Sequence, residues 1–305
     1  MILGRLGRMA YINTLPVDWG FVAGELGKLV EIQRGTPTAL NRMLAEGQLD
    51  ISPVSCVAAV EHAHEWLIVD QLCIGCHGAV GSVILQGDRP LEELHGARVA
   101  VTNASATAVQ LLKILLHAHW QVHVEFVPQE EAAEARLLIG DAALRVSQTR
   151  EASYVYDLGS AWQDYTGKSF VFGLWCVRQA FVEKHPAEAL AIGCLLKLSH
   201  AIGRSSLDDV IREAARTVGL PRGTIRRYFG QLVHDLDDRL WSGLKHFLML
   251  LGYDSRELKI FDIGNKKSKL ITGVSSLEYE RISSQIEAVV GHPLEERAEI
   301  WFGGR

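Results

Sequence analysis

The hydrophobic positions in the first half of the chain alternate between short apolar runs and stretches with apolar residues at helical spacing. Thr36 suits an N-cap and Pro37 the first position of a helix, and Ser52-Pro53 with Ser55 is expected to begin another helix. Strands are predicted before and between them, over residues 2–12, 29–34 and 49–51. The repeated order of strand, small polar residues and helix predicts an α/β protein whose sheet is covered by helices.

A break in this pattern predicts a second lobe. Gly87-Asp88-Arg89-Pro90 follows an apolar run and is expected to carry the chain into that lobe, and the apolar run 170–177 is the predicted return path. Strands are predicted in the second lobe over residues 98–102, 122–127 and 137–139. Two crossings imply a cleft between two lobes. We predict a larger lobe of residues 1–86 plus 176–257, a smaller lobe of residues 87–175, and a C-terminal extension of residues 258–305.

The C-terminal extension contains one amphipathic pattern. Residues 276–290 predict a helix that buries Ile282, Ile286 and Val289. That face would pack on a lobe or on a second copy of the chain, so a homodimer stays an open interpretation. The extension has no assigned role.

Small amide and hydroxyl residues gather at one predicted strand-to-helix junction, Asn103-Ala104-Ser105-Ala106-Thr107. The first N–H groups of a helix lack intrahelical partners and the helix dipole adds partial positive charge, so such a junction favours an anion. A single residue would suffice as the N-cap. Because three such residues within five positions exceed that need, we interpret Asn103, Ser105, Ala106 and Thr107 as a candidate anion-binding group.

Other short polar residues lie at the ends of predicted strands, where ligands bind in open α/β sheets. They include Asn13, Ser82 and Asp141. Local structure offers an alternative explanation for two of them, because Asn13 is a turn former before Pro16 and Asp141 suits an N-cap.

Composition and charge restrict the class of protein. The chain has 305 residues, 48% of them hydrophobic and 22% charged, with a net charge of −5. The negative charge argues against a nucleic-acid partner, and no apolar run approaches the length of a membrane span. Five cysteines and the lack of a signal peptide pattern at the start predict reduced thiols in a cytoplasmic protein.

Two patterns that suggest a metal or haem are rejected. Cys73-Ile74-Gly75-Cys76-His77 matches a haem-attachment motif and half of a zinc knuckle, but there is no export signal and no second ligand pair at suitable spacing. We interpret these cysteines as small core residues. His117, His119 and His123 are closely spaced, yet His117 and His119 point to different helix faces. We therefore expect no metal, and the dinucleotide and phosphate-loop motifs are also missing.

Several motifs occur together and in order: YINTLP at 11–16, GTPTALN at 35–41, DISPVS at 50–55, VGSV at 80–83, IGD at 139–141, YDLG at 156–159 and FVFGLW at 170–175. Over roughly residues 1–255, the chain resembles the chorismate dehydratase family of the futalosine route to menaquinone. The resemblance implies a two-lobed fold like that of type II periplasmic binding proteins, with the ligand clamped between the lobes. It also implies that chorismate loses water to give 3-[(1-carboxyvinyl)oxy]benzoate, with no redox or metal cofactor.

The resemblance also implies roles for individual residues. Asn13 and Ser82 match active-site positions, so Asn13 is expected to hold the reacting ring and Ser82 to bind a carboxylate or the departing hydroxyl. The 103–107 group is expected to grip a carboxylate of chorismate, together with the hydroxyl groups of Thr36 and Ser55. Since no His or Lys in the motifs must act as a base, a carboxylate of the substrate is expected to remove the ring proton. Asp141 is a further substrate-binding candidate and the rival base.

Four positions depart from the family pattern: Cys56, Ala142 and the pair Lys168-Ser169. These departures bear on specificity more than on the reaction. Two alternatives stay open: a small-acid binding protein or sensor, and the related enzyme that forms 1,4-dihydroxy-6-naphthoate. The Ser-Pro-Cys-Pro-Asn-Asp motif of that enzyme is replaced here by Asn13-Thr14-Leu15-Pro16.

Overall fold

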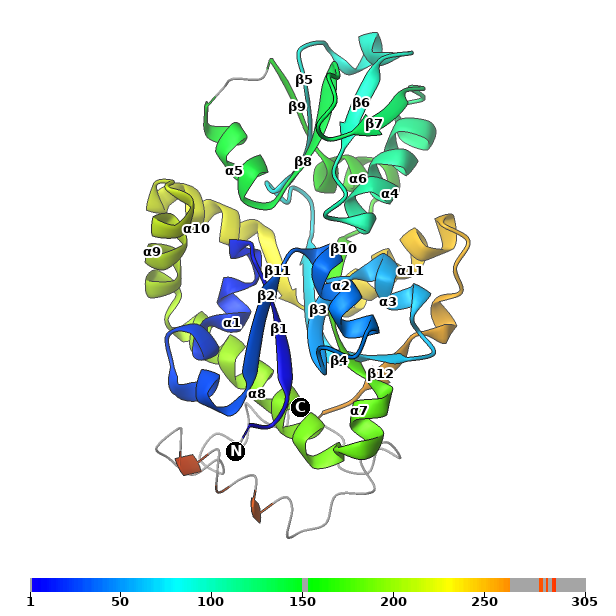
Figure 1. Ribbon diagram of the computed structural model, residues 1–305. Coiled ribbons are helices and arrows are strands. Elements are labelled where there is room, and N and C mark those ends of the chain that lie inside the picture. Colours follow the sequence, from blue (N-terminus) through cyan, green and yellow to red (C-terminus); the bar gives the residue numbers. More distant parts are fainter. Residues whose placement is uncertain (1, 150–152, 264–279, 282–283, 285–286, 289–305) are drawn as a thin grey trace.

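Two β-sheets, each covered by helices, form two lobes (Figure 1). The computed structural model describes residues 2–149, 153–263, 280–281, 284 and 287–288. The chain passes from the larger lobe to the smaller one between β4 (Trp66–Cys76) and β5 (Val83–Gly87), and it returns between α6 (Leu158–Thr166) and β10 (Phe170–Arg178) (Figure 1). This arrangement confirms the predicted α/β fold class.

The sheet of the larger lobe has the strand order β2-β1-β3-β10-β4-β11, and β12 also pairs with β4. Its strands are β1 (Arg5–Met9), β2 (Glu31–Gly35), β3 (Ile51–Ser55), β4 (Trp66–Cys76), β10 (Phe170–Arg178), β11 (Leu232–Asp235) and β12 (Lys259–Phe261). The first three strands are parallel, and β10 is antiparallel to both β3 and β4. β3 and most of β4 and β10 are buried, as expected for central strands covered on both faces.

Helices cover both faces of this sheet (Figure 1). They are α1 (Leu15–Val22), α2 (Pro37–Ala45), α3 (Cys56–Glu61), α7 (Gln179–Lys184), α8 (Pro186–Ser205), α9 (Leu207–Val218), α10 (Arg222–Gln231) and α11 (Asp238–Leu250), with short 3-10 turns η1 (Ile12–Thr14), η2 (Glu25–Leu29) and η5 (Ser255–Glu257). Thr36 caps α2 as predicted, because its side chain accepts a hydrogen bond from the Ala39 N–H. Within the described residues, no helix combines the length and apolar character needed to cross a bilayer.

The smaller lobe is built on a sheet with the order β7-β6-β8-β5-β9. Its strands are β5 (Val83–Gly87), β6 (Arg98–Val101), β7 (Glu125–Pro128), β8 (Ala135–Ile139) and β9 (Tyr154–Asp157). Its helical elements are η3 (Leu91–Leu94), α4 (Ala106–Ile114) with the π-helical turn Leu115–His119, α5 (Gly140–Thr149) and α6 (Leu158–Thr166). The start of β5, the end of β8 and the starts of α4 and α5 face the larger lobe (Figure 1).

The predicted lobe boundaries fall inside two strands. All of β5 belongs to the smaller sheet and all of β10 to the larger one, so boundaries at 86/87 and 175/176 divide elements that the structure keeps whole. The break at 87–90 follows β5 within the smaller lobe. The first crossing lies earlier, in the segment 77–82, where Gly78 and Gly81 have positive φ angles of 156° and 70°. These two glycines are the local sequence signal for the crossing, and the prediction did not use them.

Four further expectations about the elements need correction or lie outside the structure. The strand predicted over 2–12 is shorter, and Ser52-Pro53 belongs to β3, so α3 begins only after Ser55. Residues 259–261 of the predicted extension form β12 in the larger sheet. Of the helix predicted over 276–290, Ile282, Ile286 and Val289 lie outside the described residues.

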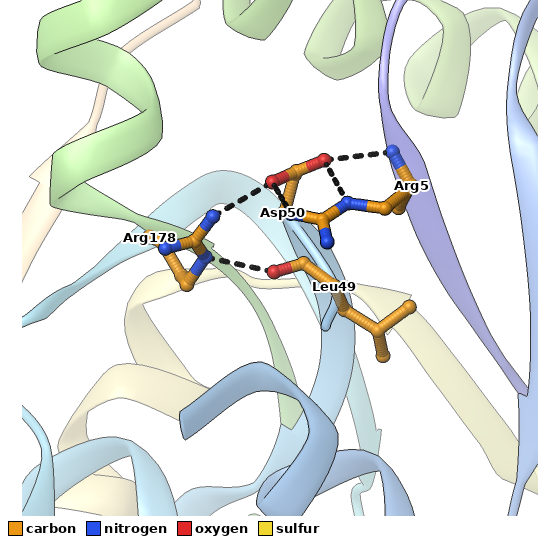
Figure 2. A network of polar contacts seen from close by, with 4 residues as sticks. All are labelled: Arg5, Leu49, Asp50 and Arg178. Atoms are coloured by element: carbon orange, nitrogen blue, oxygen red, sulfur yellow. Dashed lines mark hydrogen bonds and ion pairs between the residues drawn. The ribbon is translucent and has the colours of Figure 1, made fainter. Parts of the chain in front are cut away.

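A polar network ties three strands together at one edge of the larger sheet (Figure 2). Asp50 Oδ1 accepts hydrogen bonds from Arg5 at 2.7 Å and from Arg178 at 2.8 Å, while Asp50 Oδ2 accepts from the Arg5 backbone N–H and Nε at 2.9 and 3.0 Å. Arg178 Nε also donates to the Leu49 carbonyl at 2.8 Å. β1 begins at Arg5, β3 follows Asp50 and β10 ends at Arg178, whereas the opposite ends of these three strands line the cavity between the lobes. The network therefore fixes the strand ends that lie away from the smaller lobe.

Candidate functional site

A cavity between the two lobes brings together residues from distant parts of the chain. Its volume is about 520 Å³ including the open mouth. It is lined by Met9, Tyr11, Asn13, Pro37, Val54, Ser55, Ile74, Val80, Ser82, Val83, Ser105, Ile139, Gly140, Phe172 and Gly173. The lining contains hydroxyl and amide groups but no Lys, Arg, His, Asp or Glu among the described residues. Such a cavity offers neutral hydrogen-bond donors and acceptors within mainly apolar walls.

Asn13 has an unpartnered polar atom in this cavity. It lies in η1, just beyond the carboxyl end of β1. Its side-chain Oδ1 is buried, and no described residue donates a hydrogen bond to it. Its backbone carbonyl, by contrast, accepts a hydrogen bond from His234 Nε2 at 2.7 Å. A buried acceptor without a partner is costly, so this amide oxygen is ready to receive a donor from a ligand.

Ser82 is positioned by a hydrogen bond from Tyr228 and by the fixed loop that precedes it. It is only 4% exposed, and its hydroxyl accepts a hydrogen bond from the Tyr228 hydroxyl at 3.1 Å. Burial raises the pKa of Tyr228, so this phenol stays protonated and keeps its donor. The Asp157 carboxylate accepts the N–H groups of Val80 at 3.1 Å and of Gly81 at 2.6 Å, which fixes the preceding loop. The proton of the Ser82 hydroxyl is therefore free to point toward a ligand.

Ser55 has the same kind of support at the opposite wall. Its hydroxyl caps α3 by accepting the Ala58 N–H at 3.2 Å, and it also accepts Asn41 Nδ2 at 3.2 Å. Asn41 Oδ1 in turn accepts the Ser55 N–H at 3.1 Å. With both acceptor positions of the Ser55 hydroxyl used, its proton is the part available to a ligand.

Ser105 lines the cavity, but its neighbours in the predicted anion-binding group face elsewhere. Ser105 caps α4 by accepting the Ala108 N–H at 3.3 Å. Thr107 is fully buried, and its hydroxyl accepts the Val57 N–H at 3.3 Å and lies 3.4 Å from Cys56 Sγ. The Asn103 carbonyl accepts the Thr38 hydroxyl at 2.7 Å. Ala106 and Thr36 do not line the cavity, although Pro37 beside Thr36 does. Thr107 and Asn103 thus join the two lobes.

Asp141 also joins the lobes, beside a second cavity. Its Oδ1 accepts the Ile12 N–H at 3.2 Å. Together with Tyr11, Asn103 and Arg145 it lines a neighbouring space of about 850 Å³ including open solvent. Burial raises the pKa of Asp141, and the hydrogen bond from Ile12 partly offsets this. Asp141 is not among the residues that line the cavity of Asn13 and Ser82.

Two residues that support the site were not found from the sequence. Tyr228 and His234 come from α10 and β11, in a region where the sequence showed only helical spacing and a joint. Tyr228 is separated by 146 positions from Ser82, and His234 by 221 positions from Asn13. No local signal marks such partners. Tyr11 and Phe172, which also line the cavity, did lie within the quoted motifs.

The cysteine and histidine patterns have structural explanations. Cys73 and Cys76 are buried free thiols in β4, which confirms their interpretation as core residues. Burial raises the pKa of the Cys76 thiol to about 12, so it stays protonated. His117 and His123 lie at the surface, and His119 packs against Tyr165. Across the part of the chain that the structure describes, no three His, Cys, Asp or Glu side chains are arranged to hold a metal ion.

The chain is similar to several known proteins. A family model described as menaquinone biosynthesis matches residues 4–252. The chain is 29% identical over 269 residues to chorismate dehydratase of Thermus thermophilus, covering 81% of this chain and 94% of that protein. Its fold is similar to that of a protein from Archaeoglobus fulgidus, with a TM-score of 0.62, 17% identity and coverage of 82% of this chain and 97% of that one. It is also similar to the periplasmic aliphatic sulphonate binding protein of Escherichia coli, with a TM-score of 0.54, 15% identity and coverage of 81% and 91%.

Proposed function

Because the chain belongs to the menaquinone biosynthesis family, we propose that it removes water from chorismate to give 3-[(1-carboxyvinyl)oxy]benzoate. The observation that carries the proposal is the buried, unpartnered Oδ1 of Asn13 in a cleft lined by serine hydroxyls. The similarity to the chorismate dehydratase of Thermus thermophilus supplies the substrate.

The reaction depends more on the orientation of the substrate than on a strong acid or base from the protein. Chorismate carries two carboxylates and a ring hydroxyl, and loss of that hydroxyl with a ring proton makes the ring aromatic. One C–H bond and one C–O bond break, a ring double bond forms, and water leaves. Because the aromatic product supplies the driving force, the protein must mainly hold the substrate in a reactive geometry and limit its exposure to water.

The cavity residues fit distinct parts of this substrate. We assign to Asn13 Oδ1 the role of accepting a hydrogen bond from the ring hydroxyl, which would give this buried oxygen its missing partner. Ser55, Ser82 and Ser105 can donate their hydroxyl protons to the carboxylates or to the departing hydroxyl. Among the described residues, the lining offers no ionisable base other than Tyr11, whose pKa is raised by burial. We therefore assign removal of the ring proton to a carboxylate of the substrate itself.

Asp141 serves as a matched test of this assignment. Asp141→Asn should leave kcat within about threefold of the unmodified protein, because an amide oxygen still accepts the Ile12 N–H and no proton transfer is lost. Steady-state loss of the cyclohexadiene absorbance of chorismate measures this rate. A fall of a hundredfold or more with unchanged KM would instead make Asp141 the base.

The function itself is tested by incubating purified protein with chorismate. We expect the cyclohexadiene absorbance to disappear and mass spectrometry to find a product lighter by one water. Tight binding of chorismate that stays unaltered would instead indicate a small-acid binding protein; the Escherichia coli protein of similar fold is an aliphatic sulphonate binding protein. Activity on cyclic dehypoxanthinyl futalosine alone would indicate the naphthoate-forming enzyme.

A further inference from the structure

His234 lies directly behind the proposed active site. It sits in β11, which pairs with β4 in the larger sheet. The residue is 8% exposed, and its Nε2 is 2.7 Å from the backbone carbonyl of Asn13. This is a short contact between a side chain and the main chain of a residue that lines the cavity.

The charge state of His234 is set by its surroundings. Burial lowers the pKa of His234 to about 4, so the ring is neutral near neutral pH and its Nε2 carries the proton that the Asn13 carbonyl accepts. The ring of His200 packs edge-on against it, with ring centres 5.8 Å apart. His200 Nδ1 is 3.6 Å from Asp235, which also pairs with Arg204 at 3.1 Å. These neighbours leave the imidazole little freedom to rotate.

The main chain around Asn13 is held on its other side as well. Thr14 donates its hydroxyl proton to the buried Asp18 at 2.7 Å, and Arg8 Nε lies 3.5 Å from the same carboxylate. Asn13 therefore sits between two buried anchors, whereas its own side chain makes no hydrogen bond through Oδ1. With the backbone fixed at both positions, the amide can keep its direction without a protein partner.

We propose that His234 is a positioning residue for the dehydration, which acts by holding the Asn13 carbonyl so that the Asn13 amide points at the reacting ring. This inference rests on the proposed function, since Asn13 is assigned its role there. A displacement of about 1 Å in a group that orients the substrate can cost a hundredfold in rate. The hydrogen bond from His234 is thus expected to affect kcat more than substrate binding.

Two substitutions separate the hydrogen bond from the ring volume. His234→Phe keeps a planar ring but removes the donor, and it should lower kcat about 10- to 100-fold with KM changed less than about threefold. His234→Gln restores an N–H donor and should recover most of kcat. His246→Phe is the matched control, because His246 lies in α11 against Trp162 and neither residue lines the cavity; it should leave kcat unchanged. Circular dichroism and thermal unfolding check that each variant folds.

A second readout does not depend on turnover. In protein labelled with ¹⁵N-asparagine, the side-chain amide signal of Asn13, identified by its loss in Asn13→Ala, should shift in His234→Phe and return in His234→Gln. If the unmodified protein leaves chorismate unchanged, the proposed function fails while this signal still tests the positioning role. A His234→Phe variant with normal kcat and an unshifted Asn13 signal overturns the inference. A His234→Phe variant that has a lower melting temperature, but a normal kcat and an unshifted Asn13 signal, also overturns it.

Discussion

Asn13→Ala is expected to reduce the turnover of chorismate by about a hundredfold or more, comparable to the loss of one preorganised polar contact in other enzymes. The reason is specific to this cavity. Its lining has no charged side chain that could orient the ring instead, and Oδ1 of Asn13 is the buried polar atom there without a partner among the described residues. Steady-state kinetics with chorismate, followed by the loss of its absorbance, measure the effect.

The same substitution is expected to leave the free energy of unfolding unchanged or slightly higher. A buried acceptor without a hydrogen bond stabilises the ligand complex but not the free protein, so its removal takes away a desolvation cost. Gln48→Ala, which removes an amide at an exposed position near Glu46, is the control for handling and purity. A normal kcat in Asn13→Ala would remove Asn13 from the site. A parallel loss of stability would show that its role is structural.

Much of the site could be predicted because its signals are local. Ser55 and Ser105 were visible as polar residues before helices, and both cap their helices and line the cavity. Asn13 and Ser82 were visible at strand ends, in motifs that the family resemblance singled out. Each of these residues depends on the order of strand, cap and helix within a few positions, which a sequence pattern records.

The rest depended on contacts that no local pattern records. Asn103 and Thr107 belong to the same polar cluster as Ser105, yet both hydrogen-bond across the lobes. The sequence shows a surplus of polar groups at the junction but not that Thr38 and Val57 lie opposite them. Tyr228 and His234 were missed for the same reason. The lobe boundaries were misplaced because the Gly-Pro break at 87–90 gave a stronger turn signal than the glycines at 78 and 81, where the chain actually crosses.

The second large effect is expected at the network of Asp50, Arg5 and Arg178, which joins the strand ends of the larger sheet that lie away from the cavity (Figure 2). Asp50→Ala should lower the free energy of unfolding by about 2–4 kcal/mol, since removing one partner of a buried pair typically costs 3–5 kcal/mol. We expect a smaller loss than is typical because the two arginines are partly exposed. The Asp50 side chain is 5% exposed, but those of Arg5 and Arg178 are 35% and 23% exposed, so water can hydrate their charges once Asp50 is removed. Urea denaturation monitored by tryptophan fluorescence measures the change. Asp88→Ala, at an exposed carboxylate of the smaller lobe, should change stability by less than about 0.5 kcal/mol.

The pH dependence of this difference identifies its origin. Burial alone would raise the pKa of Asp50, but the hydrogen bonds from Arg5 and Arg178 outweigh it and hold the pKa below its ordinary value of about 3.9. The contribution of Asp50 is therefore complete above the pKa of the unfolded chain and is lost as the pH falls through the lower pKa of the folded protein. Above about pH 5 the Asp50 carboxyl is ionised in both the folded and the unfolded protein, so the difference in stability between the unmodified protein and Asp50→Ala should be constant between pH 6 and 8. Below about pH 4 this difference should shrink. A gap that stays constant down to pH 3 would mean that the loss comes from packing around Asp50 rather than from its charge.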